Sequence, residues 1–179
     1  GSKGETVNPV RGLCTPISAG CARCYARAQV PRMRRLGAPG YETDEPTFHP
    51  KVLAQVLRWK KPRTIFWGSM FDLFEERVPD DWIAACFGVM AATPQHVHVV
   101  LTKRAARMRE WFGWVDAYAS ERFGLRSERL GLCRAAAASA GVDEKLIPDD
   151  MHAGGMDWPP PNVVLMATVE NWQTRSRLD

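Results

Sequence analysis

The stretch Arg63-Thr64-Ile65-Phe66-Trp67-Gly68 decides the fold class. It is short, rich in β-branched and aromatic residues and closed by a turn residue, which is typical of a buried strand. Two further stretches share this character: Val97-His98-Val99-Val100-Leu101 and, after three prolines, Asn162-Val163-Val164-Leu165-Met166-Ala167-Thr168-Val169. Strands that are apolar along nearly their whole length predict a parallel sheet covered on both faces.

Helical patterns separate these strands. Pro50 to Trp59 carries apolar residues at helical spacing, Pro79 to Met90 opens with a proline and two acids suited to a first turn, and Ala105 to Phe123 gives a longer pattern. The order strand, helix, strand implies right-handed crossovers and therefore an α/β fold. On this pattern alone, a doubly wound sheet and a barrel both remain open.

The chain of 179 residues is expected to form a single domain (1–179) with an insertion over 124–161, between the third and fourth strands. The insertion contains an alanine-rich helix over 134–141 that ends at glycine, followed by a loop rich in glycine and proline. The last residues, 169–179, are typical of a strand end and the first turn of a helix, without a stop signal. We therefore expect the domain to be truncated at its C-terminus.

The composition excludes several classes of protein. With 45% hydrophobic and 25% charged residues, the chain is typical of a soluble globular domain. No apolar run approaches the roughly 20 residues that span a bilayer, so we expect no membrane association and a cytoplasmic location. The net charge of +4 does not by itself indicate nucleic-acid binding, but five arginines and no acid between Arg23 and Arg35 create a local positive field.

Three of the five cysteines stand close together. Cys14, Cys21 and Cys24 have the spacing C-x6-C-x2-C in a segment that also contains glycine and proline. An odd number of cysteines in a cytosolic chain argues against a disulfide framework. Three thiolates satisfy three irons of a [4Fe-4S] cluster and leave the fourth iron open, whereas structural zinc needs a fourth protein ligand. The spacing favours cluster and zinc equally, and three reduced core cysteines remain a further alternative.

The other candidate residues have simpler interpretations. Cys86 and Cys133 are expected to be small core residues, and His96 and His98 to lie in the core or at a loop edge. Trp111 and Trp114, at helical i,i+3 spacing, are typical of core packing.

The cysteine motif resembles that of a known superfamily. The strings Asn8-Pro9-Val10-Arg11-Gly12, Cys14 and Cys21-Ala22-Arg23-Cys24-Tyr25-Ala26-Arg27 resemble the cluster-binding loop of radical S-adenosyl-L-methionine (SAM) enzymes, particularly the spore-photoproduct-lyase-like branch. They are more similar still to an uncharacterised phage-encoded family with a three-cysteine motif, whose later segments resemble 61–74, 94–104 and 161–171. The first gap has six residues instead of the usual three, and 68–72 replaces the usual glycine-rich segment.

The resemblance implies a partial (β/α)6, TIM-like radical SAM barrel whose first strand lies near Thr6 to Val10. Such folds bind ligands at the carboxyl ends of their parallel strands. The implied ligands are a [4Fe-4S] cluster, held by Cys14, Cys21 and Cys24, and SAM. By analogy, Ser69 and Asp72 would meet the methionine amino group of SAM. The positions implied to contact SAM are Tyr25, Ser69, Met70, Asp72, Lys103, Glu170 and Asn171, and Arg104 follows the same strand as Lys103.

The activity implied by the resemblance is reductive cleavage of SAM to a 5′-deoxyadenosyl radical, which takes a hydrogen atom from the substrate. A reductant such as flavodoxin or ferredoxin would supply the electron, in the cytosol of a bacterium or of a phage-infected host. Nucleic acid or a nucleotide is the first expectation for the substrate, and a peptide or protein the second. The alternative is a zinc-stabilised, non-catalytic phage accessory module that binds DNA or protein. The sequence predicts no catalytic side chain and no oligomeric state.

Overall fold

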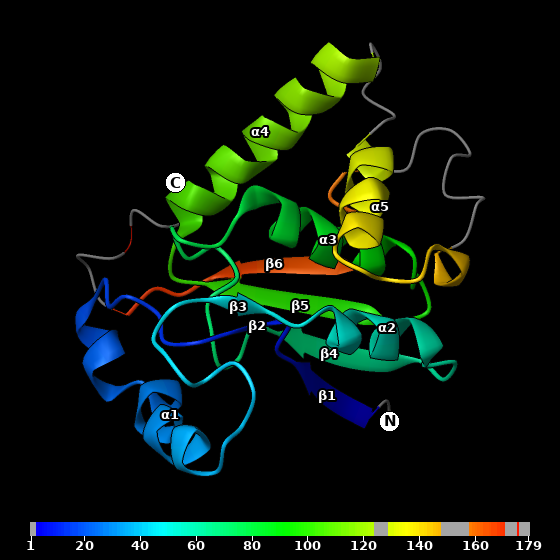
Figure 1. Cartoon of the computed structure of the whole chain (residues 1–179). Helices are drawn as coiled ribbons and strands as arrows, with labels where there is room; N and C mark the ends of the chain where they lie inside the picture. Colours follow the sequence, from blue (N-terminus) through cyan, green and yellow to red (C-terminus); the bar gives the residue numbers. More distant parts are fainter. Residues whose placement is uncertain (1–2, 124–128, 148–157, 171–174, 176–179) are drawn as a thin grey trace.

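The computed structural model describes residues 3–123, 129–147, 158–170 and 175 (Figure 1). Along the chain the described elements are β1 (Lys3–Val7), β2 (Val10–Arg11), η1 (Ala19–Arg23), α1 (Tyr25–Arg35), β3 (Thr47–Phe48), α2 (Pro50–Arg58), β4 (Arg63–Trp67), α3 (Asp80–Ala91), β5 (Val97–Thr102), α4 (Ala105–Phe123), α5 (Arg129–Ser139), η3 (Glu144–Leu146) and β6 (Val163–Ala167). The predicted helices that begin at Pro50, near Pro79 and at Ala105 are confirmed, as are the three predicted strands.

Within the described residues, the main sheet has four parallel strands in the order β1-β4-β5-β6. This confirms the α/β class. The expected first strand, Thr6 to Val10, is only partly right, because the parallel strand runs from Lys3 to Val7. Pro9 has no N–H for a sheet ladder, so the chain leaves the sheet there. Val10 and Arg11 pair instead with Phe48 and Thr47 in a small antiparallel ladder, β2 with β3.

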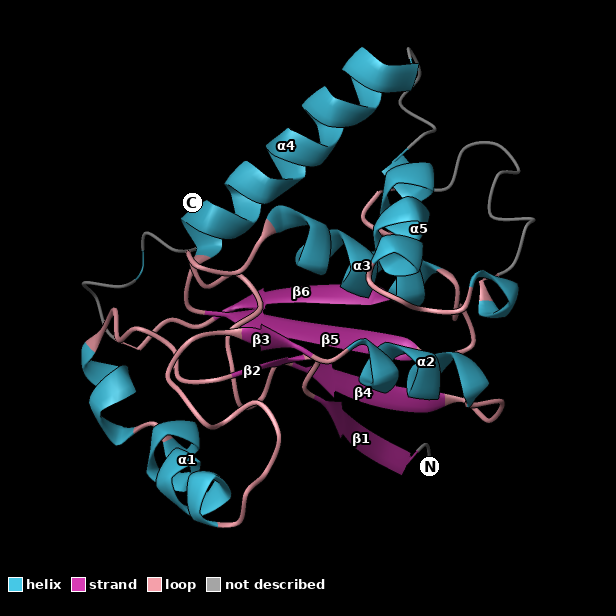
Figure 2. Ribbon diagram, viewed as in Figure 1, coloured by secondary structure: helices cyan, strands magenta, loops and turns pink. Residues whose placement is uncertain are grey.

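The helices of the core lie on one side of the main sheet. Figure 2 shows α3, α4 and α5 together above the strands, and α2 also packs against α3. The strand residues that face these helices are buried, including Ile65, Trp67 and Val100. On the other face, Val97, Val164 and Met166 are exposed. The prediction that both faces are covered is therefore wrong for the described part of the chain.

Aromatic side chains fill the core between α3 and the helices beside it. Phe87 packs on Trp111 with ring centroids 4.7 Å apart, and Phe74 and Phe112 surround the pair. The predicted core positions of Cys86, Cys133, His96, His98 and Trp111 are confirmed, since all five are buried.

Helix α5, which belongs to the predicted insertion, packs closely against α3. The two helices approach at Gly88, where a Cβ atom would overlap the carbonyl of Cys133. The described part of segment 124–161 is thus part of the core of the protein.

His98 is the polar centre of this core. Its Nδ1 accepts a hydrogen bond from the indole N–H of Trp67 at 2.9 Å, so the ring proton must sit on Nε2, which lies 3.0 Å from the hydroxyl of Thr93. That hydroxyl donates in turn to the carbonyl of Val89 at 2.7 Å. Burial lowers the pKa of His98 to about 4, so the imidazole is neutral in the folded protein.

Among the described residues, no helix combines the length and the apolar character that a membrane span requires.

Candidate functional site

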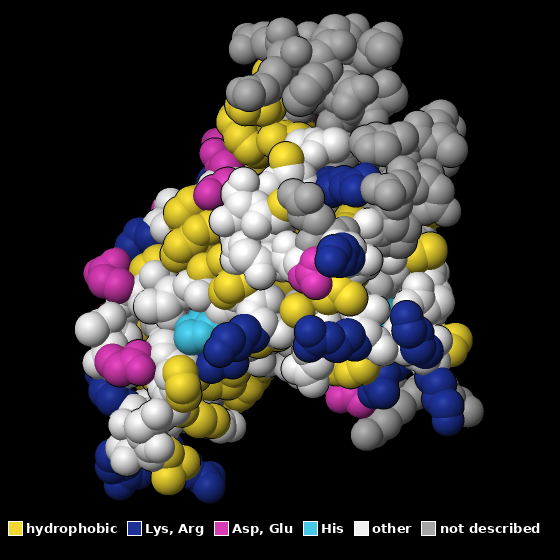
Figure 3. Space-filling view, turned by 45° about the vertical axis from the view of Figure 1, so that its right-hand side comes forward, with side chains coloured by type: hydrophobic (Ala, Val, Ile, Leu, Met, Phe, Trp, Pro, Cys, Tyr) yellow, Lys and Arg dark blue, Asp and Glu magenta, His cyan; other side chains and the backbone are white. Residues whose placement is uncertain are grey.

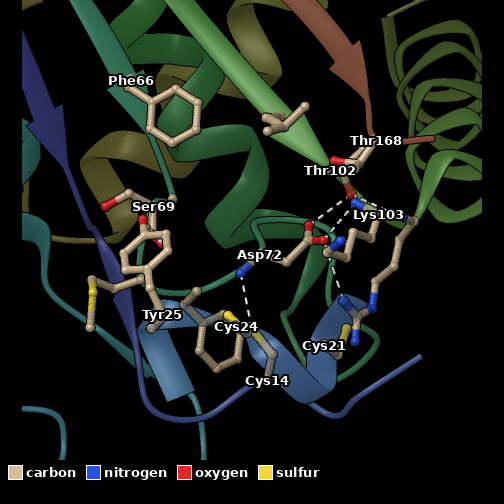
Figure 4. A pocket seen from close by; sticks show the side chains of 16 residues that line it. Cys14, Cys21, Cys24, Tyr25, Phe66, Ser69, Asp72, Thr102, Lys103 and Thr168 are labelled. Carbon is tan, nitrogen blue, oxygen red and sulfur yellow. Dashed lines mark hydrogen bonds and ion pairs between the residues drawn. The ribbon is translucent and has the colours of Figure 1, made fainter. Parts of the chain in front are cut away.

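A cavity of about 210 Å³ lies at the carboxyl ends of the parallel strands. Figure 4 shows the cysteine loop along one side of this cavity and the ends of β4, β5 and β6 along the other. The residues that line it are Cys14, Cys21, Cys24, Tyr25, Ala26, Phe66, Gly68, Ser69, Met70, Phe71, Asp72, Leu101, Thr102, Lys103, Arg104 and Thr168. The fold therefore brings all three cysteines of the motif to one cavity, together with five of the positions that the resemblance implied.

The cysteine loop carries its three thiols in different surroundings. Cys14 precedes η1, Cys21 is buried within it, and Cys24 is the residue before the first turn of α1. All three are free thiols. The sulfur of Cys14 accepts a hydrogen bond from the backbone N–H of Asp72 at 3.1 Å, and that of Cys21 lies 3.6 Å from the Ser18 hydroxyl. Among the described residues, the sulfur of Cys24 has no such hydrogen bond.

The pKa values of these two thiols shift in opposite directions. Burial raises the pKa of Cys14 to about 12, although the N–H of Asp72 opposes the change. Burial would also raise the pKa of Cys21, but hydrogen bonds with Ile17 and Ser18 and the charge of Lys103 lower it overall. Binding of a metal through Cys14 would therefore release a proton from this thiol.

Asp72 connects the loop after β4 to the end of β5. Its Oδ1 accepts from the Thr102 hydroxyl at 2.8 Å and from the N–H of Phe74 at 3.0 Å. Its Oδ2 accepts from the N–H of Lys103 at 3.0 Å and from the guanidinium of Arg104 at 3.3 Å. The carboxylate thus has four protein donors, so a ligand amino group would have to share one of its oxygens with them.

Glu170 joins the end of β6 to η1. Its carboxylate accepts from the Ser18 hydroxyl at 3.0 Å and from the N–H of Gly20 at 2.9 Å, and it forms an ion pair with Lys103. A Cβ atom at position 20 would overlap this carboxylate, so the glutamate side chain would have to shift to admit one. Glu170 contacts the cysteine loop but is not among the residues that line the cavity. Asn171, the next position that the resemblance implied to contact SAM, lies outside the described residues.

Tyr25 stands at the mouth of the cavity with 55% of its surface exposed. Its hydroxyl donates to the carbonyl of Ser69 at 2.6 Å. The loop that carries Ser69 and Met70 is held by Asn8, whose Oδ1 accepts from the Ser69 hydroxyl at 3.2 Å and from the N–H of Met70 at 2.9 Å. Phe66 of β4 supplies an apolar part of the lining (Figure 4).

Several residues of the site were not predicted from the sequence. The sequence offers a signal for Asn8, because this residue begins the Asn8-Pro9 string directly after the first strand. Phe66 and Thr102 lie at the carboxyl ends of β4 and β5. Their place at the cavity could be predicted only if the last residue of each strand were already known. No sequence motif marks Glu75 and Arg77, which bind the backbone on either side of Cys14.

A second cavity, of about 300 Å³, shares Lys103 and Arg104 with the first and extends over the start of α4. Its remaining lining residues include Arg107, Arg109 and Glu76. Lys103 and Arg104 therefore line both cavities.

The chain belongs to a family described as "Protein of unknown function (DUF5131)", whose family model matches residues 3–179. No curated protein and no solved structure matches the chain.

Proposed function

We propose that this chain is a radical SAM enzyme that binds a [4Fe-4S] cluster. Cys14, Cys21 and Cys24 would bind three irons of a [4Fe-4S] cluster and leave the fourth iron free for SAM. The observation that carries this proposal is the meeting of all three thiols at one cavity, at the carboxyl edge of a parallel sheet. This edge is where α/β folds bind their ligands.

The donor set at the cavity fits an iron–sulfur cluster better than structural zinc. The loop contributes three thiols, and structural zinc needs a fourth protein ligand. In the part of the chain that is described, no three His, Cys, Asp or Glu side chains are already close enough together to hold a metal ion. Assembly of the cluster would therefore draw the three thiols together, with Cys14 kept in place by the N–H of Asp72.

The chain itself would bind, orient and shield the reactants. When bound, the cluster and SAM supply the redox chemistry that yields a 5′-deoxyadenosyl radical. Phe66, Leu101 and the exposed ring of Tyr25 offer apolar surface for an adenine. Ser69 and Met70 lie beside them, on the loop that Asn8 holds. Lys103 and Glu170 neutralise each other next to the cysteine loop and so fix its position.

The uncovered face of the sheet supports a partial (β/α)6 barrel over a doubly wound sheet. A doubly wound sheet has helices on both faces, whereas a barrel has helices outside and side chains within. Here the helices cover one face, and the other presents Val99, Leu101, Val164 and Met166 from neighbouring strands. This face leads to the cavity through Phe66 and Leu101, as the interior of a barrel would.

Nucleic acid or a nucleotide remains our first proposal for the substrate, and flavodoxin or ferredoxin for the reductant. Of the arginines near the cysteines, Arg27 and Arg34 are used in internal hydrogen bonds, to the carbonyls of Cys14 and Tyr41. Arg23, Arg32 and Arg35 are exposed. On the face shown in Figure 3, Lys and Arg side chains are spread out with acids between them, which agrees with the mild net charge of +4.

The proposal is tested by the iron content of single-cysteine variants after anaerobic reconstitution with iron and sulfide. Cys14→Ala, Cys21→Ala and Cys24→Ala should each lose most of the iron that the wild type binds. Cys133→Ala is the matched control, because it removes a buried thiol far from the motif, and it should keep the wild-type iron content. Stoichiometric zinc with no iron in the wild type would favour the zinc-stabilised binding module instead.

A further inference from the structure

The backbone on both sides of Cys14 is held by side chains that come from outside its loop. The carbonyl of Leu13 accepts a hydrogen bond from Arg77 at 2.8 Å, and that of Cys14 accepts one from Arg27 at 3.0 Å. The N–H of Thr15 donates to Glu75 at 3.2 Å, and the carbonyl of Thr15 accepts from Arg104 at 2.6 Å. Four side chains from distant parts of the sequence thus fix three consecutive residues.

Glu75 and Arg77 act on this backbone as one unit. Glu75 is fully buried, and its two oxygens accept from the guanidinium of Arg77 at 2.9 to 3.2 Å. The same guanidinium donates to the carbonyl before Cys14, while the same carboxylate accepts from the N–H after it. A buried carboxylate is stable only if it is paired and hydrogen-bonded, so the position of each partner is tightly determined.

Cys24 has less support of this kind. Cys21 lies in η1, which Glu170 holds through the Ser18 hydroxyl and the N–H of Gly20, whereas among the described residues the sulfur of Cys24 has no hydrogen bond. The six residues between Cys14 and Cys21 make the first gap of the motif long. A longer gap raises the entropy that must be lost when its two ends are brought together.

We infer that Glu75 and Arg77 are positioning residues that hold Cys14 at the cavity before any metal binds, so that Cys24 is the cysteine with the most freedom to move as the site is completed. This inference rests on the proposed function of Cys14 as a metal ligand. The pair touches no ligand itself and acts through the backbone of Leu13 and Thr15.

The alternative is that the pair stabilises the fold without any particular effect on Cys14. The chain offers a matched control for this alternative in Arg63, which pairs with Glu5 and lies 4.6 Å from the ring of Trp59. Arg63 and Glu5 are partly buried, and Arg63 begins β4, at the opposite end of this strand from the cysteine cavity.

The test is the alkylation rate of each cysteine in the metal-free full-length chain, measured by iodoacetamide labelling and peptide mass spectrometry. In the wild type, Cys14 should react more slowly than Cys24. In Glu75→Gln and in Arg77→Gln, the rate at Cys14 relative to Cys24 should rise about tenfold, because the loop then opens more often. Arg63→Gln should leave this ratio unchanged, even if it lowers the melting temperature equally.

An unchanged ratio in both Glu75→Gln and Arg77→Gln would overturn the inference, and so would an equal rise in Arg63→Gln. Arg77→Gln keeps the test decisive if Glu75→Gln does not fold, because Arg77 is one-third exposed. The outcome is separate from that of the proposed function, since the labelling uses no metal. The proposed function fails if the wild type binds no cluster, whatever the labelling rates show.

Discussion

Phe87 and Glu75 are both fully buried, but different interactions hold them in place. Phe87 belongs to α3 and packs among other aromatic rings. Glu75 lies beside the cysteine loop, where ion pairs and hydrogen bonds surround it. The first region gains free energy from apolar area removed from water, whereas the second depends on geometry that fails when one partner is lost. The core therefore sets the stability of the protein, and the polar region sets the shape of the site.

The largest expected effect lies in the core. Phe87→Ala should lower the free energy of unfolding by about 3–5 kcal/mol, because it leaves a cavity between Trp111 and Phe112. Urea denaturation measures this change. Val164→Ala, on the uncovered face of β6, is the control, and we expect it to cost about 0.5 kcal/mol or less. Equal costs for the two variants would contradict the assignment of the core to one face of the sheet.

The next largest effect is a pH dependence of stability caused by His98. Its folded-state pKa is lowered to about 4, so below its ordinary value of 6.5 the unfolded chain binds a proton that the folded chain does not. Stability should therefore fall as the pH drops from 6.5 towards 4, by about 3 kcal/mol from this group.

Denaturation curves at several pH values check this prediction. The variant His98→Gln should be less stable near pH 7, because it disturbs the hydrogen bonds with Trp67 and Thr93. It should also lose the part of the pH dependence that lies between pH 6.5 and 4. An identical pH dependence in the variant would show that other groups cause it.

A smaller effect is expected where Glu170 meets η1. Gly20→Ala places a methyl group on the carboxylate of Glu170, and we expect a cost of about 1–2 kcal/mol. In the Glu170→Ala background the same substitution should cost less, because the carboxylate is gone. A double-mutant cycle measures the difference, and additive costs would mean that the two residues do not meet in solution.

The smallest effect should come from the ion pair between Arg34 and Asp44, both of which are largely exposed. Arg34→Gln should change the free energy of unfolding by about 0.5 kcal/mol or less at this pair, since solvent and salt screen it. The experiment compares unfolding at low and high salt. A loss larger than that of Gly20→Ala would show that the hydrogen bond of Arg34 to the carbonyl of Tyr41 matters more than the ion pair.

Strands and helices were predictable because their signals are local. The apolar runs of β4 and β5 and the helical spacing of α2 each lie within one short window of sequence. Local signals of this kind could not predict which faces of the sheet are covered by helices. Val97 and Met166 are apolar and yet exposed, because burial of a sheet face depends on which helices pack on it.

The site was predictable to the extent that a motif or a strand end marked its residues. The cysteines and the residues after β4 and β5 do meet at one cavity. The roles of Asp72 and Glu170 were not predictable, because their carboxylates bind donors that are distant in sequence. For the same reason nothing in the sequence singles out Glu75, whose partner Thr15 lies 60 residues away.

The most direct test of the central claim is electron paramagnetic resonance of the reconstituted, dithionite-reduced chain, with and without SAM. If Cys14, Cys21 and Cys24 hold a [4Fe-4S] cluster with one open iron, the reduced protein will show the signal of such a cluster, and SAM will change that signal. A chain that gives no cluster signal after reconstitution, or a signal that SAM leaves unchanged, would contradict the account.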